Sequence, residues 1–196
     1  LLNAKIRAKA AFRAIYFLPM VVAPAAIAMV WKWIFNAEYG IINQIIGTKV
    51  SWLTTPGLVL PACAVVAIWS AVGYDAILLL SGIQNISKSY YEAASLDGAS
   101  TFQIFRYITV PLLNPVIQFV VITSTIGGWQ LFAEAQMLVG TAGGIGKSGM
   151  TVVLYLYNQA FGNRQFGYGS AISWALVVII GFCSLINWLL TRREVD

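Results

Sequence analysis

The sequence contains no histidine and only two cysteines among its 196 residues. Histidine is the commonest metal ligand and the usual proton-transfer group near neutral pH. In this chain histidine can fill neither role. Cys63 and Cys183 fall in separate apolar stretches with no metal-ligand spacing, so we expect small buried side chains there. No convincing pair of acidic residues takes over the missing chemistry. We therefore expect no catalytic residue, no metal site and no stand-alone intramembrane enzyme.

Charge is also scarce, since 10% of the residues are charged while 59% are hydrophobic and the mean hydropathy is +0.78. A soluble domain of this length carries about 25% charged residues. Four stretches are long enough to cross about 30 Å of hydrocarbon as helices. They run from Ala14 to Phe35, Leu58 to Leu80, Pro111 to Trp129 and Ala171 to Leu190. The sequence therefore predicts an all-α, polytopic bundle with four transmembrane spans, in which residues 1–196 form a single domain.

The 12 basic residues predict how the spans are oriented. With alternating spans, one side receives Lys5, Arg7, Lys9, Arg13, Lys88, Arg106, Arg192 and Arg193. The other side receives only Lys32, Lys49, Lys147 and Arg164. The positive-inside rule makes the richer side cytoplasmic, so the C-terminus is predicted to be cytoplasmic. The net charge of +5 is then a topology signal, because basic residues spread over several loops do not form a nucleic-acid footprint.

The predicted external segment 140–170 opens with TAGGIGKSG and continues with TVVLYLYNQAF. The second run is too short to span a membrane, and it suits a short interfacial helix or, with its valines and tyrosines, a strand. Gly146, Lys147 and Ser148 match the end of a phosphate-binding loop. Thr141 occupies the place of the required first glycine, however, and the predicted topology puts the run outside the cell. We expect a flexible external loop here, with ATP handled by another chain.

The predicted cytoplasmic loop 81–107 carries local helix signals. Ser89 and Glu92 have capping-box spacing, which predicts a short helix that begins near Ser89. Gly98 can adopt the left-handed conformation that ends a helix, and Ser100 and Gln103 repeat the capping-box spacing directly afterwards. Two short helices are therefore predicted to meet at Gly98.

The same loop contains a longer pattern, with Glu92, Ala93 and Ala94 followed at fixed spacing by Gly98, Ile108 and Pro111. This pattern resembles the cytoplasmic E-A-A loop of the membrane-spanning subunits of ABC importers. The one departure is Val110, where that family more often has leucine. The resemblance implies that the loop docks onto an ATP-hydrolysing subunit through Glu92, Ala93, Ala94, Asp97 and Gly98.

Three further stretches resemble permease subunits that import carbohydrates: Trp69 to Ile86, Trp129 to Glu134 and Phe166 to Ile172. That family has a six-helix core in each permease subunit, of which this chain would hold the last four helices. The amphipathic start LLNAKIRAKAAFR fits the end of an earlier helix, so we expect the chain to be incomplete at its N-terminus.

The resemblance implies a complete assembly around this chain. Its partners would be a second, homologous permease subunit, two ATP-binding subunits that hold ATP and Mg, an extracytoplasmic solute-binding protein and membrane lipid. The chain itself would need no cofactor, would bind no nucleic acid, and would sit in a bacterial or archaeal cytoplasmic membrane. A sugar or an oligosaccharide is the expected cargo, with a polyol or a glycerophosphodiester as alternatives. An ATP-independent channel is a different class, and the spans lack the polar run that a pore-lining ring would need.

Sugar recognition needs aromatic faces beside polar groups that exchange hydrogen bonds with hydroxyls. The candidates for this substrate path are Tyr74, Asp75, Trp129, Gln130, Phe132 and Glu134. The resemblance places Tyr74, Trp129 and Gln130 along the translocation path, whereas helix packing or interface anchoring is the alternative for each aromatic. A carboxylate such as Asp75 inside a span costs about 2.5 to 3.5 kcal/mol, so it is expected to face water or a partner. Glu134 alternatively lies at the outer mouth, where water alone would solvate it.

Overall fold

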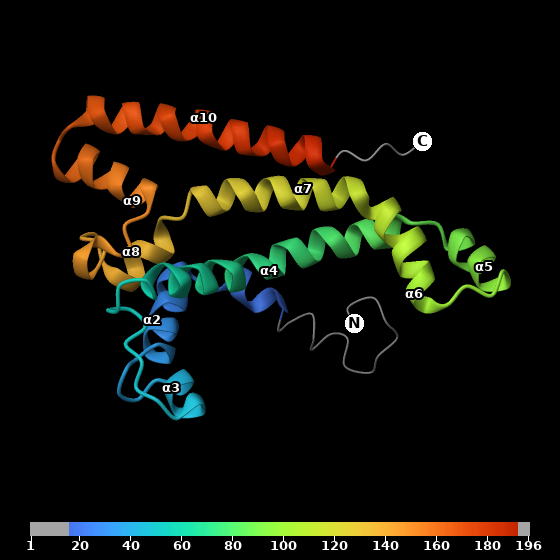
Figure 1. Cartoon of the computed structure of the whole chain (residues 1–196), viewed down its shortest axis with the longest axis horizontal. Coiled ribbons are helices and arrows are strands. Elements are labelled where there is room, and N and C mark those ends of the chain that lie inside the picture. Colours follow the sequence, from blue (N-terminus) through green and yellow to red (C-terminus); the bar gives the residue numbers. More distant parts are fainter. Residues whose placement is uncertain (1–15, 192–196) are drawn as a thin grey trace.

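The computed structural model describes residues 16–191, and every regular element in that range is a helix. Three long helices lie side by side in Figure 1: α4 (Val59–Asn85), α7 (Val110–Trp129) and α10 (Phe166–Thr191). The middle helix, α7, packs against both of the others. This arrangement confirms the predicted all-α helical bundle.

Three helical runs within the described residues are long and apolar enough to cross a membrane. They are Val59–Asn85, Thr101–Trp129 and Phe166–Thr191, and at most 17% of the apolar window of any of them is buried inside the chain. Most of their apolar surface is therefore left for lipid or for other proteins. The predicted spans from Leu58, Pro111 and Ala171 correspond to these three runs.

The predicted span from Ala14 to Phe35 is wrong as a single helix. Its first residues lie outside the described range, and within that range a helical turn at 16–21 stops before α2 (Pro24–Ile34) begins. Pro24 has no N–H to continue the hydrogen-bond ladder, and it forces the preceding Ala23 into an extended conformation with ψ of 134°. The 11 residues of α2 reach only about 16 Å. The described residues therefore hold three spans, not four.

One end of the bundle holds the shorter helices α2, α3 (Ile41–Ile46), α8 (Ala133–Val139) and α9 (Val152–Tyr157), as Figure 1 shows. They enclose the main buried cluster with the start of α4, and its largest fully buried side chains are Leu154, Val59, Val66 and Cys63. Cys63 is buried as predicted, whereas Cys183 is only half-buried.

The connection between α2 and α4 is organised by one buried amide. The Asn43 Nδ2 donates to the carbonyls of Val50 at 2.9 Å and Ala37 at 3.1 Å, with the Asn36 carbonyl at 3.4 Å, and its Oδ1 accepts a 2.8 Å bond from Trp52 Nε1. A buried polar group whose bonds are all made to the surrounding chain holds that chain in one conformation. The connection between α2 and α4 is thus a folded unit.

The opposite end of the bundle carries α5 (Lys88–Leu96) and α6 (Thr101–Ile104), which extend beyond the ends of α4 and α7 in Figure 1. Neither helix contains a buried residue. These are the two short helices predicted within segment 81–107, and α4 continues into this segment to Asn85.

Most of the second half of segment 140–170 is helical too. The run TVVLYLYNQAF forms α9 and a π-helix at Asn158–Gly162, which decides for helix over strand. The TAGGIGKSG run forms turns with positive φ at several positions, and Gly149 N–H donates to the Gly143 carbonyl at 2.8 Å. A phosphate-binding loop leads directly into a long helix, but no long helix begins directly after Lys147.

Candidate functional site

The two short helices α5 and α6 are joined by a left-handed turn at Gly98, as predicted. The N–H of Ala99 donates to the carbonyl of Ala94, and the N–H of Gly98 donates to that of Ser95. These are the two bonds of a Schellman motif, which requires positive φ at the residue between the helix cap and the next segment. Gly98 has a φ of 76°, and a Cβ built there would meet no atom within 4 Å. Backbone conformation, and not space, therefore selects glycine.

The helix starts are only partly as predicted. Ser100 and Gln103 form the expected reciprocal capping box of α6. At α5, however, the cap is Ser87, whose side chain accepts from the N–H of Ser89, so the predicted Ser89 and Glu92 box is wrong. Glu92 is thereby free of a capping role and lies exposed on α5.

A π-helix at Phe105–Thr109 separates α6 from α7, and sequence reasoning missed it. Pro111 cannot donate to the carbonyl four residues before it, and its ring crowds that carbonyl, so a wider turn just before it relieves the conflict. Thr109 ends this turn and is buried, and its hydroxyl lies 3.3 Å from the hydroxyl of Tyr91 on α5. This contact links α5 to the base of α7.

The surface around α5 and α6 is apolar and open. Five large side chains are more than half exposed: Tyr90 at 54%, Leu96 at 89%, Phe102 at 73%, Phe105 at 56% and Tyr107 at 72%. A depression of about 300 Å³ lies beside Gly98, and its lining includes Asp97, Gln103 and Tyr107. Glu92 and Ala93 are exposed, and Ala94 is half-buried. The residues predicted for coupling thus lie together on a surface that another protein can reach.

Polar side chains cross-link the three long helices. Ser124 on α7 lies 3.4 Å from a carboxylate oxygen of Asp75 on α4, which is longer than a strong O–H···O bond. On the other side of α7, Asn187 of α10 donates to the hydroxyl of Thr125 at 2.8 Å. Asp75 is half-buried and makes no ion pair with any residue that the structure describes. Its carboxylate is therefore available to water or to a ligand.

The other residues predicted for the substrate path do not form one cluster. Tyr74 is 44% exposed on α4, and Trp129 and Gln130 are exposed where α7 ends. Since Ser124 lies opposite Asp75, Trp129 stands about 7.5 Å further along the axis of α7. Phe132 packs against the buried cluster and lies 5.2 Å from the ring of Tyr157, which fits the packing alternative. Glu134, in the first turn of α8, lines a separate cavity.

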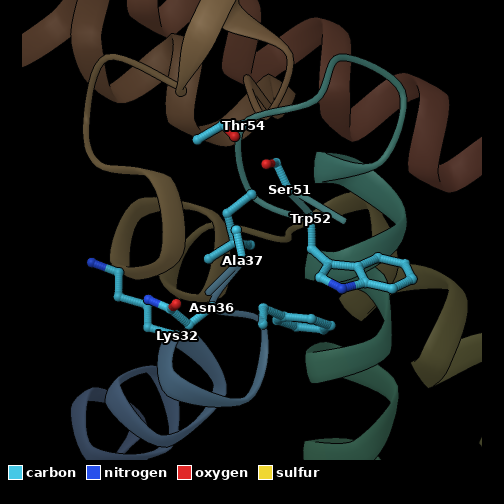
Figure 2. A pocket seen from close by; sticks show the side chains of 8 residues that line it. Lys32, Asn36, Ala37, Ser51, Trp52 and Thr54 are labelled. Carbon is cyan, nitrogen blue, oxygen red and sulfur yellow. The ribbon is translucent and has the colours of Figure 1, made fainter. Parts of the chain in front are cut away.

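A groove lies at the end of the molecule that is opposite to α5. Figure 2 shows Lys32, Asn36, Ser51, Trp52 and Thr54 around one part of it, which has a volume of about 330 Å³. An adjoining part of about 510 Å³ is also lined by Lys32, Leu53 and Thr54, and it extends to Gly140 and Ile145.

The groove offers a free cation beside hydroxyl and amide groups. Lys32 makes no ion pair within the described range, where Lys49 pairs with Glu38 at 2.6 Å. Sequence reasoning did not find this groove because α2, the chain before α4 and the segment after α8 form it together. In the sequence, the one local indication of this groove is Lys32, a lysine within an apolar run. Residues 16–191 hold no group of three acidic, cysteine or histidine side chains that could bind a metal.

The sequence matches a known family over most of its length. A profile of the family described as "Binding-protein-dependent transport system inner membrane component" covers residues 2–193. The lactose transport system permease protein LacF of Rhizobium radiobacter is 35% identical over 98% of this chain and 66% of its own length. The arabinooligosaccharides transport system permease protein AraP of Halalkalibacterium halodurans is 34% identical over 97% of this chain and 62% of its own length. The chain thus spans about two thirds of these relatives or slightly less.

Two solved structures share the fold. One is a bacterial ABC transporter involved in the import of the acidic polysaccharide alginate, with a TM-score of 0.78 and 20% identity over 98% of this chain and 68% of that one. The other is a bacterial alginate ABC transporter in complex with an alginate pentasaccharide-bound periplasmic protein, with a TM-score of 0.81 and 23% identity over 94% and 65%. At this identity the likeness establishes the arrangement of the helices.

Proposed function

We propose, because this chain belongs to the family of binding-protein-dependent transport system inner membrane components, that it is a permease subunit of an ATP-driven importer for a sugar or an oligosaccharide. The chain is a multi-pass membrane protein of that family, with three apolar helices long enough to span. The observation that carries the proposal is the E-A-A pattern on α5, a helix without buried residues at one end of the spans. Permeases named for lactose and for arabinooligosaccharides supply the substrate class.

In this proposal α5 inserts into a groove of the ATP-hydrolysing subunit, which binds ATP and Mg. Small Ala93 and Ala94 keep the helix surface low, and the exposed Tyr90 and Leu96 supply apolar contact area. The contact between Tyr91 and Thr109 then passes a movement of α5 to the base of α7. Two such subunits would close on ATP and open the translocation path outward.

The proposed orientation puts α5 and the C-terminus in the cytoplasm. Lys88 and Arg106 flank the E-A-A residues, as the positive-inside rule requires. The end with α2, α3, α8 and α9 then faces the outside, where the Lys32 groove would receive an acidic surface of the solute-binding protein. The exposed apolar faces of α4, α7 and α10 leave room for a second permease subunit.

The translocation path is proposed to follow α4 and α7, from Trp129 and Gln130 at the outer end to Asp75 deeper in the bundle. Tyr74 and Trp129 offer partly exposed rings for the apolar face of a sugar, and Gln130 offers an amide for its hydroxyls. Phe132 is proposed to serve packing instead, which its ring contact with Tyr157 supports.

Replacing Trp129 or Gln130 by alanine should raise the sugar concentration for half-maximal uptake several-fold. One lost stacking contact or hydrogen bond is worth about 0.5 to 1.5 kcal/mol. Uptake is measured against sugar concentration in proteoliposomes, at equal amounts of assembled complex. Trp174→Ala is the matched control because Trp174 is 72% exposed on α10, away from the proposed path. If all three variants follow the wild-type curve, the path does not pass Trp129 and Gln130.

A further inference from the structure

A cavity of about 280 Å³ lies between the helical turn 16–21, α2, α4 and α8, and the proposed path does not use it. Its lining is almost entirely apolar, with Pro19, Met20, Ile27 and Val66 among the residues. Among the lining residues that the structure describes, only Ser70 of α4 and Glu134 of α8 have polar side chains. The cavity is therefore a small apolar site with one carboxylate and one hydroxyl.

No residue in the described part of the chain pairs with the Glu134 carboxylate. It forms no ion pair or hydrogen bond with any residue between 16 and 191. The carboxylate is half-buried, so part of its hydrogen-bonding capacity is open to water or to a ligand in the cavity. The half-buried position of Glu134 argues against the alternative of a fully solvated outer residue.

The break in the first helix adds a further acceptor. Met20 and Pro24 both line the cavity, and Pro24 has no N–H with which to bond the Met20 carbonyl four residues before it. Backbone carbonyls released at breaks in transporter helices act as acceptors, and they are known to coordinate cations. The cavity thus offers a carboxylate, a free carbonyl and a hydroxyl, so acceptors outnumber donors.

This cavity is distinct from the contact between Asp75 and Ser124. Ser70 and Asp75 are five residues apart on α4, which rotates them about 140° around the helix axis. Asp75 points to α7, whereas Gly73, near Ser70, lies against the backbone of Tyr16. Glu134 in the cavity and Asp75 on the proposed path are therefore two separate carboxylates.

We infer that the Glu134 cavity binds one ring of an uncharged, hydroxyl-rich sugar and rejects sugars that carry a carboxylate, an inference that rests on the proposed function. Sugar hydroxyls would donate to Glu134 and Met20, and Ser70 would exchange one bond. A uronate would bring a second negative charge to within a few ångströms of Glu134, and none of the described lining residues is basic. The volume of about 280 Å³ is slightly below the range of about 300 to 1,000 Å³ that drug-sized ligands occupy, which suits a single ring.

The test uses the full-length permease assembled with its partner permease and ATP-hydrolysing subunits in nanodiscs. The solute-binding protein is left out because its own selectivity would mask that of the permease. Binding of the neutral disaccharide galactobiose and of the acidic disaccharide digalacturonate is measured by saturation-transfer NMR, in sodium chloride and in choline chloride. The variants are Glu134→Gln and Ser70→Ala, with Glu38→Gln as the control, since Glu38 is an exposed carboxylate outside the cavity.

The wild type should bind galactobiose at least about tenfold more tightly than digalacturonate, because like charges at this distance repel strongly. Glu134→Gln should reduce this preference to about twofold, Ser70→Ala should weaken galactobiose binding several-fold, and Glu38→Gln should change neither value. Binding of neither sugar, an equal affinity for both, or a preference that Glu134→Gln leaves intact overturns the inference. Binding that requires sodium and Glu134 overturns it in favour of a cation site. Sugar uptake by the complete wild-type importer tests the proposed function separately, since it can succeed when the cavity test fails.

Discussion

Replacing Gly98 by valine should reduce sugar-stimulated ATP hydrolysis and sugar uptake at least tenfold. Gly98 has a φ of 76°, and the Schellman bonds from Gly98 and Ala99 depend on that conformation. The left-handed region costs an ordinary residue about 1 to 2 kcal/mol, and a β-branched side chain tolerates it worst. The turn should then unwind and displace α5 from the ATP-hydrolysing subunit. Both activities are measured at equal amounts of assembled complex.

Asparagine at the same position is the matched control. Asn adopts the left-handed conformation more readily than other non-glycine residues, and no atom lies within 4 Å of a Cβ at Gly98. Gly98→Asn should therefore keep most of the activity. Wild-type uptake in the valine variant would show that the turn is only a connector. An equal loss of activity in both variants would instead show that the ATP-hydrolysing subunit tolerates no side chain at this position.

Replacing Gly82 by leucine should destabilise the bundle and abolish most uptake. Gly82 faces α7, and a Cβ there would lie 2.5 Å from Leu113 Cδ1 and 2.9 Å from Val116 Cγ2. The flexible end of Leu113 can move aside for one atom, but a leucine must push α4 away from α7. Overpacking of this kind costs about 1 to 3 kcal/mol. The thermal unfolding temperature of the purified permease should fall by several degrees.

Gly181→Leu makes the same change where the structure leaves room. Gly181 lies within α10, and a Cβ built there would meet no atom within 4 Å. This variant should unfold within about one degree of the wild type, because surface substitutions change stability by less than about 0.5 kcal/mol. An equal loss of stability in both variants would mean that the second permease subunit covers Gly181. An unchanged Gly82→Leu variant would refute the close packing of α4 and α7.

Composition predicted the three spans because lipid contact leaves an apolar signal that needs no tertiary information. Hydropathy marks the residues that contact lipid, but it does not mark where a helix begins or ends. The structure accordingly extends α4 past Leu80 to Asn85 and begins α10 before Ala171. The first predicted span failed for a visible reason. Pro24 can be tolerated inside a helix when neighbours satisfy the freed backbone groups, but here the chain turns, and α2 crosses the end of α4 (Figure 1).

Local chemistry predicted the E-A-A turn better than it predicted the rest of the candidate site. The positive φ at Gly98 and the capping box that begins at Ser100 depend on a few adjacent residues. Whether Ser87 or Ser89 caps α5 depends instead on where the preceding helix α4 ends. The Lys32 groove and the Glu134 cavity join segments that are distant in the sequence. A single residue hinted at each, Lys32 in an apolar run and Glu134 beside aromatic residues, but no single stretch predicts the residues that surround it.

The central claim is that this chain meets an ATP-hydrolysing subunit at one end and a solute-binding protein at the other. Site-specific photo-crosslinking in membrane vesicles that contain the active importer tests it most directly, with a photoreactive residue at exposed Ala93 or at exposed Thr54 of the groove. The probe at Ala93 should capture the ATP-hydrolysing subunit, and the probe at Thr54 should capture the binding protein. Capture of the binding protein from Ala93, or no capture of the ATP-hydrolysing subunit from Ala93 in an importer that still transports, would contradict the account.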